Sequence, residues 1–198
     1  MGEQLRSSRK GRAYRMGARA DQVAQTRQRI VAATVALHAS VGPAHTTVSA
    51  IAQRAGVTRV TVYQHFPDDD ALFAACTAHW AAQQQMPDLG AWLTVSDPAT
   101  RLQVALTDLY RFFADGEPLL TCASRDREAL PEFVRLRNQE RDAVRVEAVL
   151  SAWPSRQRTS TRRALVAHAL DFSTWRSLCY EHGLPVRAAV EAMTRLIC

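Results

Sequence analysis

The sequence predicts an all-α protein in which a small amino-terminal domain of three helices is followed by a larger helical domain. Apolar residues recur at spacings of three and four along most of the chain, which is the period of a helix that buries one face. Glycine and proline interrupt this pattern where helices would end. No strand-like alternation or hairpin dipeptide stands out after Phe73.

Composition places the 198-residue chain among globular proteins. Apolar residues make up 47% of it and charged residues 22%, which argues against general disorder. Neither a long apolar run nor the apolar core of a signal peptide is present, so we expect a cytoplasmic protein without a membrane helix. In a cytoplasmic protein the four cysteines are expected to be reduced thiols. Their wide spacing offers no paired metal-ligand motif.

Positive charge is concentrated in the first third of the chain. Residues 1–66 hold ten of the 25 lysines and arginines but only two of the 19 acidic residues. The remaining residues are therefore close to neutral. Such asymmetry is typical of a protein that meets a polyanion with one end, although an arginine-rich solvated tail would produce it too.

The predicted elements begin with a flexible basic arm over residues 1–25. This segment has three glycines and almost no large aliphatic residues, so it cannot bury enough apolar surface to offset the entropy of ordering. From Thr26 the helical pattern begins with Ile30 and continues to Val41. Gly42 and the proline after it end this first helix.

Two short helices are predicted next. The hydroxyls of Thr46 and Thr47 can cap the first, and Gly56 follows it where a left-handed residue would end the helix. Thr58 can cap the second, which runs through His65. Because two short helices joined by a glycine-containing turn are typical of DNA-binding helix-turn-helix motifs, we assign residues 26–73 to such a domain.

One face of the third helix carries residues suited to a DNA groove. If Val62 and Phe66 point into the core, Arg59, Val60 and Tyr63 share the opposite face. Arginine can fork onto guanine, and apolar groups can contact thymine methyls. Polar side chains along the rim suit phosphate oxygens; these are Thr47, Ser49, Thr61, Gln64 and His65.

Residues 27–73 resemble the DNA-binding domain of the tetracycline-repressor (TetR) family of transcriptional regulators. The resemblance rests on the threonine pair, the run IA..AGV over residues 51–57, the run T.Y.HF over residues 61–66, and AL at residues 71 and 72. It implies base contacts by Arg59, Val60 and Tyr63. It also implies contacts with the DNA backbone by Thr47, Ser49, Thr58, Thr61 and His65.

The sequence departs from the family pattern in two places. Val60 stands where the family often has a small residue or proline. Asp68, Asp69 and Asp70 precede the fourth helix, where the family commonly has a lysine that meets a phosphate. Because acids near DNA would repel it, we expect these residues to cap the fourth helix instead. We hypothesise that the basic arm replaces the lost phosphate contact.

Residues 74–198 are predicted to form a helical ligand-binding and dimerisation domain. Helices are expected at about 70–85, 102–116, 118–123, 128–150, 160–182 and 186–197. Trp92 and Leu93 should pack down in a loop, and the helix over 128–150 should bury Phe133, Leu136, Val144 and Val149.

The last two predicted helices carry more apolar surface than one face needs. The family resemblance implies that they form a four-helix bundle in a homodimer, whose two-fold symmetry would match a palindromic operator. Docking of the terminal helix on its own domain is the alternative.

The resemblance also implies a pocket for an unidentified small-molecule effector in the second domain. Its candidate lining residues are Leu106, Tyr110, Phe113, Phe133, Trp153 and Trp175, each of which is equally typical of a core. Arg137 is expected to be solvated rather than to bind an anion.

These observations predict a sequence-specific regulator that binds double-stranded DNA. The family resemblance implies that it is a ligand-responsive repressor and a homodimer. No nucleophile elbow, phosphate loop or zinc-binding helix is present in the sequence, so neither enzyme activity nor a cofactor is expected. Two alternatives stay open. One is a ligand- or partner-binding protein with a vestigial helix-turn-helix, consistent with the three aspartates. The other is a non-specific DNA binder driven by its basic tail, with a steep salt dependence.

Overall fold

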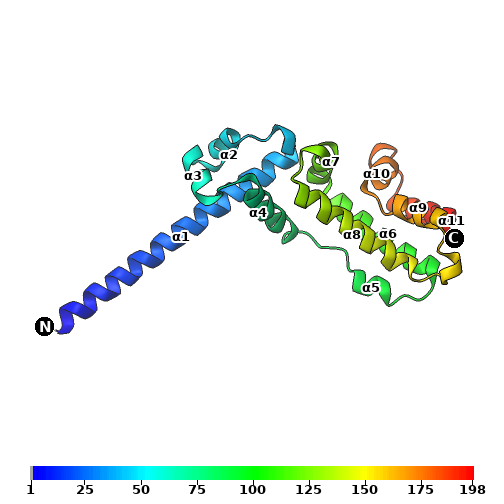
Figure 1. The fold of residues 1–198 in the computed structure, drawn as a ribbon, viewed down its shortest axis with the longest axis horizontal. Helices are drawn as coiled ribbons and strands as arrows, with labels where there is room; N and C mark the ends of the chain where they lie inside the picture. The colour runs from blue at the N-terminus through cyan, green and yellow to red at the C-terminus, as the bar shows by residue number, and fades with distance from the viewer. Residues whose placement is uncertain (1) are drawn as a thin grey trace. The chain divides into compact units, whose positions relative to one another are not determined.

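The structure, a computed structural model, describes residues 2–198, with side chains from residue 19 onward. Helices and turns account for its secondary structure, and no strand occurs between residues 2 and 198, which confirms the predicted all-α class. The chain divides into two compact units, Met1–Trp80 and Ala81–Cys198, whose helices can be followed in Figure 1. Among the residues that the structure describes, no helix is both long and apolar enough to cross a bilayer.

The first helix is longer than the sequence predicted. Helix α1 spans Gly2–Ser40, so the predicted start at Thr26 is wrong, and residues 2–25 continue the helix instead of forming an irregular arm. Residues 19–25 are exposed and gain no packing from the core. Because the segment has no proline and the helix is already nucleated beyond it, the helix extends without a second nucleation step, against a cost of about 1 kcal/mol for each interior glycine.

Helices α2 (Val48–Ala55) and α3 (Arg59–His65) form the predicted helix-turn-helix. Thr47 Oγ1 accepts a hydrogen bond from the Ala50 amide at 3.2 Å and caps α2. Gly56 ends α2 in the left-handed conformation, with φ of 66°. Both features confirm the predicted boundaries.

The core of the first unit lies between α1, α2, α3 and α4 (Asp69–Ala81). The predicted inward residues Val62 and Phe66 are 1% and 2% exposed, and Ile30 of α1 is fully buried. Asp68 Oδ1 accepts a hydrogen bond from the Ala71 amide at 2.7 Å. This bond confirms that the acidic run caps α4, which ends four residues earlier than the predicted Gln85.

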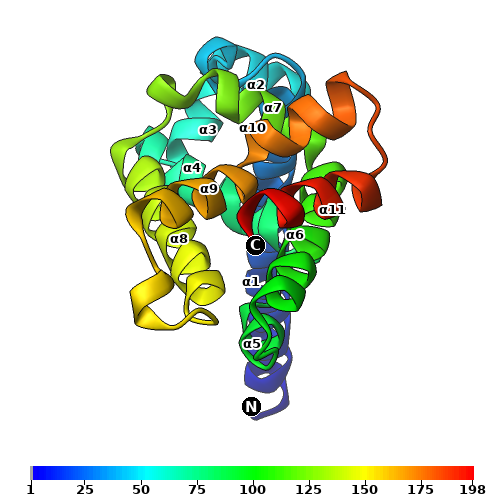
Figure 2. The same cartoon turned by 90° about the vertical axis from the view of Figure 1, so that its right-hand side faces the viewer.

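The second unit is a helical bundle around α6. In chain order its helices are α5 (Leu89–Leu93), α6 (Pro98–Asp115), α7 (Glu117–Arg125), α8 (Glu132–Leu150), α9 (Ser160–Ala169), α10 (Phe172–Trp175) and α11 (Val186–Ile197). Figure 2 shows α6 beside α11 at the carboxyl end of the chain. Helix α6 also packs on α5 and α8, and the Tyr110 hydroxyl donates to the Ala169 carbonyl at 3.0 Å.

A buried arginine holds three segments of this unit together. Arg101 of α6 is 6% exposed. Its Nη1 donates to the Ala148 carbonyl at 2.9 Å and to Ser151 Oγ at 2.6 Å, at the end of α8. Its Nε donates to the Val95 carbonyl at 2.7 Å, and Nη2 to that of Leu93 at 3.3 Å. The guanidinium thereby donates hydrogen bonds to carbonyls near the ends of α5 and α8, where the helix itself does not supply every donor.

Burial in two segments differs from the prediction. The expected loop contains α5, in which Trp92 is fully buried but Leu93 is 52% exposed. In α8 the predicted inward residues Leu136 and Val144 are 51% and 56% exposed, whereas Val149 is fully buried. The helix therefore faces the core with a different stripe, which includes Val134, Arg145 and Val146.

The single helix predicted over residues 160–182 is divided in the structure. Helix α9 ends at Ala169, and Asp171 Oδ1 accepts a hydrogen bond from the Ser173 amide at 2.8 Å to cap α10. A π-helical turn over Arg176–Glu181 follows. An aspartate side chain that bonds to a nearby amide competes with the helical backbone, which accounts for the break.

The terminal helix α11 agrees with its predicted range and packs on α6 and α9 of its own chain. Its apolar stripe is therefore largely covered, with Ala189 at 0% and Val190 and Ile197 at 5% exposure. Leu196 of α11 and Tyr180 of the π-helical turn remain more than half exposed.

Candidate functional site

The outer face of α3 presents the three side chains that the sequence predicted for it. Val60 is 65% and Tyr63 49% exposed, and Arg59 is exposed as well. Val62, on the same helix, is buried in the core. The burial pattern therefore confirms that Arg59, Val60 and Tyr63 share the face opposite the core, while their contacts with DNA stay a prediction.

The polar rim of this face is already partly engaged in helix capping. Thr58 Oγ1 accepts a hydrogen bond from the Thr61 amide at 3.1 Å, and the two hydroxyl oxygens lie 2.9 Å apart. Each hydroxyl still has bonding capacity, because it offers one donor and two acceptor positions. Ser49 and Gln64 are exposed and His65 is half-buried.

The end of α3 is fixed to α1 by an aromatic contact. The Arg27 guanidinium lies 4.3 Å from the centre of the Phe66 ring, within the range of a cation–π interaction. Since Phe66 follows directly after α3 and is buried, its ring anchors the helix at the end opposite the Thr58 cap. The exposed face of α3 is thus held on a short helix that is fixed at both ends.

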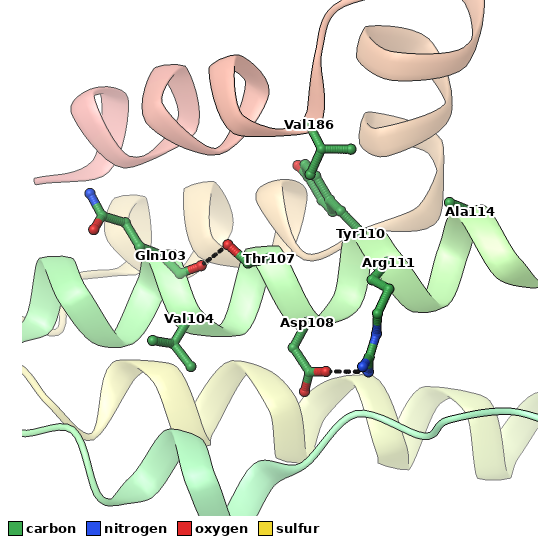
Figure 3. Close-up of a pocket in the computed structure, with 8 residues that line it drawn as sticks. All are labelled: Gln103, Val104, Thr107, Asp108, Tyr110, Arg111, Ala114 and Val186. Atoms are coloured by element: carbon green, nitrogen blue, oxygen red, sulfur yellow. Dashed lines mark hydrogen bonds and ion pairs between the residues drawn. The ribbon is translucent and has the colours of Figure 1, made fainter.

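The second unit contains an open groove along α6. It has a volume of about 720 Å³ and runs past the beginning of α11, with Tyr110 and Val186 among its walls. Figure 3 shows these residues together with Asp108 and Arg111, which form an ion pair at 2.6 Å. Tyr110 is one of the six predicted pocket residues, and it borders this groove.

A more enclosed pocket of about 230 Å³ lies between α6, α8, α9 and α10. Phe113, another predicted residue, lines it. Leu106, Trp153 and Trp175 are at most 4% exposed and belong to the core. Phe133 is half-buried, with the exposed Arg137 lying 6.0 Å from its ring.

A segment of the first unit matches a known protein family. Residues 30–76 match the sequence profile described as bacterial regulatory proteins, tetR family. This segment of the chain is similar to the tetR family. The matched range contains α2, α3 and the beginning of α4, so the exposed face of α3 lies within the segment that is similar to this family.

Solved structures extend the likeness in fold to most of the chain. A TetR-like transcriptional regulator from Rhodococcus sp. RHA1 superimposes with a TM-score of 0.60 at 19% identity, over 87% of this chain and 93% of that one. A tetR-family transcriptional regulator from Streptomyces coelicolor gives a TM-score of 0.56 at 20% identity, over 87% and 77%. Among curated proteins no significant match was found.

Sequence reasoning missed Arg145 in the second unit of the chain. Arg145 lines the enclosed pocket and is 4% exposed. Burial and the nearby charge of Arg141 lower the pKa of Arg145 to about 10. Its position was available from the sequence, because Arg145 lies one turn before Val149 and shares its face. The sequence analysis instead placed Leu136 and Val144 on the buried face, so the shared face of Arg145 and Val149 was not recognised.

Proposed function

We propose that this DNA-binding regulator acts as a cytoplasmic homodimer on a palindromic operator, represses transcription there, and is released by a small-molecule effector. The observation that carries the proposal is the exposed face of α3, which combines Arg59, Val60 and Tyr63 on a helix capped by Thr58. Exposed apolar side chains beside an arginine are unfavourable in water but suit the major groove.

Each residue of this face has a role in the proposal. The Arg59 guanidinium donates two parallel hydrogen bonds to a guanine, and Val60 and Tyr63 contact base edges, including thymine methyls. Thr47, Ser49, Thr58, Thr61, Gln64 and His65 hold the DNA backbone and set the register of α3 in the groove.

The homodimer is proposed to form through the last two helices. Tyr180 and Leu196 support it, because both belong to this part of the chain and remain 58% and 56% exposed. The buried stripe of α11 does not contribute to it, since α6 and α9 already cover that stripe. A two-fold dimer would place two α3 helices on successive half-sites, which accounts for a palindromic operator.

The effector is proposed to bind in the enclosed pocket of the second domain. A ligand there changes operator affinity only if it binds one conformation of the dimer better than the other, so tight binding alone does not suffice. Titration of operator-bound protein with a ligand tests this coupling, because independent binding of ligand and operator would reject it.

Selection of bound genomic fragments at physiological salt, followed by footprinting, tests the function itself. A short palindromic footprint is the expected result, with a specific Kd on the order of 10⁻⁸ to 10⁻¹¹ M. Arg59→Ala should cost roughly 1–3 kcal/mol and relax one base position. Arg163→Ala, which removes an exposed arginine of α9, is the matched control and should leave affinity unchanged.

The same selection separates the two alternatives. Equal enrichment of all fragments with a steep salt dependence would establish a non-specific binder. Enrichment of none would establish a vestigial helix-turn-helix. For the basic arm, deletion of residues 1–19 should weaken binding and reduce the salt slope, and unchanged values of both would reject its role as a substitute phosphate contact.

A further inference from the structure

The enclosed pocket has an aromatic wall formed by Phe112, Phe113 and Phe172. The rings of Phe113 and Phe172 meet edge to face, with centres 5.4 Å apart and planes at 85°. The rings of Phe112 and Phe113 have centres 5.8 Å apart. All three residues line the pocket, together with Leu120 and Val146, so most of a ligand held here would contact apolar atoms.

A pair of arginines from α8 forms the polar side of the same pocket. Arg145 Nη1 lies 3.2 Å from Asp142 Oδ1, and Arg141 Nε lies 3.9 Å from the same oxygen. One carboxylate therefore faces two guanidinium groups. Asp171 also lines the pocket, but its Oδ1 is occupied as the cap of α10 and accepts from the amide and hydroxyl of Ser173. The two guanidinium groups thus face the carboxylates of Asp142 and Asp171, of which Asp171 is already engaged by Ser173.

Arg145 has an unused donor within this environment. Its Nε is buried and has no hydrogen-bond partner in the described part of the chain. Its guanidinium lies 6.0 Å from the centre of the Phe112 ring, and the residue is 4% exposed. A buried donor without a partner costs free energy, and an acceptor brought by a ligand would remove that cost.

A neighbouring cavity of about 150 Å³ extends the basic side. It shares Arg141, Asp142 and Phe172 with the enclosed pocket and adds Arg127 and Arg135 to the lining. Arg135 pairs with Glu128 at 3.3 Å. Arginines therefore line both cavities, and Arg141 and Phe172 border each of them.

We infer that the enclosed pocket binds a small organic acid, with one carboxylate held by Arg145 and Arg141 and an aromatic or short aliphatic body against Phe112, Phe113 and Phe172. The inference rests on the proposed role of this pocket as the effector site. The volume sets the size of the ligand: an apolar cavity of ~150 Å³ accepts benzene, so about 230 Å³ accommodates a single ring with a carboxylate.

Direct binding to the full-length protein, measured by calorimetry without DNA, tests the inference. The probes are benzoate and octanoate, each compared with its neutral amide. Because a hydrogen bond to a charged partner contributes more than one to a neutral partner, each acid should bind about ten- to a hundredfold more tightly than its amide. Equal affinity of acid and amide, or binding of neither acid, would overturn the inference.

Variants assign the effect to the arginine. Arg145→Met should reduce affinity for the acids about ten- to a hundredfold and leave the amides unaffected. Arg145→Lys, which keeps the charge but loses the planar fork, should fall between Met and wild type. Arg163→Met removes an exposed arginine that pairs with Glu147 and should change nothing. Unaltered binding of the acids by Arg145→Met would also overturn the inference.

An operator-release assay with the same acids separates this inference from the function on which it rests. Selective acid binding that depends on Arg145 supports the site whether or not operator is released. Acid binding without release would refute the effector role of the pocket. Specific operator binding by a protein that shows no preference for the acids would overturn the inference and leave DNA recognition intact.

Discussion

The strongest test of how the helical domain is held together is removal of the buried Arg101 guanidinium. In Arg101→Met the side chain keeps most of its apolar length but loses four hydrogen bonds of 2.6–3.3 Å. The carbonyls of Leu93, Val95 and Ala148 would then lose a charged donor. A hydrogen bond to a charged group contributes about 1.5–3 kcal/mol, and such contributions do not add fully within one network.

The expected loss in the free energy of unfolding is therefore about 3–5 kcal/mol, because three carbonyls lose this donor and each unsatisfied buried group costs about 1–3 kcal/mol. Urea denaturation of the full chain, followed by far-ultraviolet circular dichroism, measures it, and the thermal midpoint should fall by about 10 °C or more. Arg187→Met is the matched control, because Arg187 is 91% exposed and pairs only within α11 with Glu191. A loss below about 1 kcal/mol for Arg101→Met would refute the assigned role.

Three further predictions concern the first unit. Gly56→Ala should destabilise it by roughly 1–2 kcal/mol in urea titrations, because a side chain is strained at φ of 66° although the nearest atom, Arg29 Nη1, is 3.9 Å away; no loss would exclude backbone strain at the turn. Asp68→Ala should cost about 1 kcal/mol in the same assay, whereas Asp69→Ala leaves the capping bond to Ala71 intact and should cost less; equal losses would contradict the assigned cap. Burial lowers the pKa of His38, which stacks on Phe73, from 6.5 to about 4. Neutral His38 therefore contributes stability that is fully present above pH 6.5 and is lost as pH falls through about 4, to at most about 3 kcal/mol; His38→Phe should flatten the pH dependence of unfolding in this range, and an unchanged slope would assign it to other groups.

Local signals in the sequence were sufficient to predict the helix-turn-helix. Thr47, Gly56 and Thr58 act through hydrogen bonds or backbone angles within a few residues of themselves, and all three behave in the structure as predicted. The exposed face of α3 could be predicted for the same reason, because Val62 and Phe66 fix the orientation of such a short helix.

The second domain was harder to predict because its burial depends on distant segments. Leu136 and Val144 fit a helical stripe as well as Val134 and Val146 do, and the choice is made by contacts of α8 with α5, α6 and α9. Likewise, a single aspartate within an apolar pattern does not predict a helix break. In the structure, however, Asp171 caps α10 and separates it from α9. The buried Arg145 was missed because arginine is rarely buried unless it has a partner.

The packing of α11 on α6 and α9 determines how a newly made chain reaches its folded state. Each chain covers the apolar stripe of its own α11, so folding of one chain does not require a second copy, unlike in dimers that have no stable monomer. A chain present at only a few copies per cell can therefore fold and survive before it meets another copy. In the proposed homodimer, pairing would then affect DNA binding, whereas the survival of a single chain would not depend on a partner.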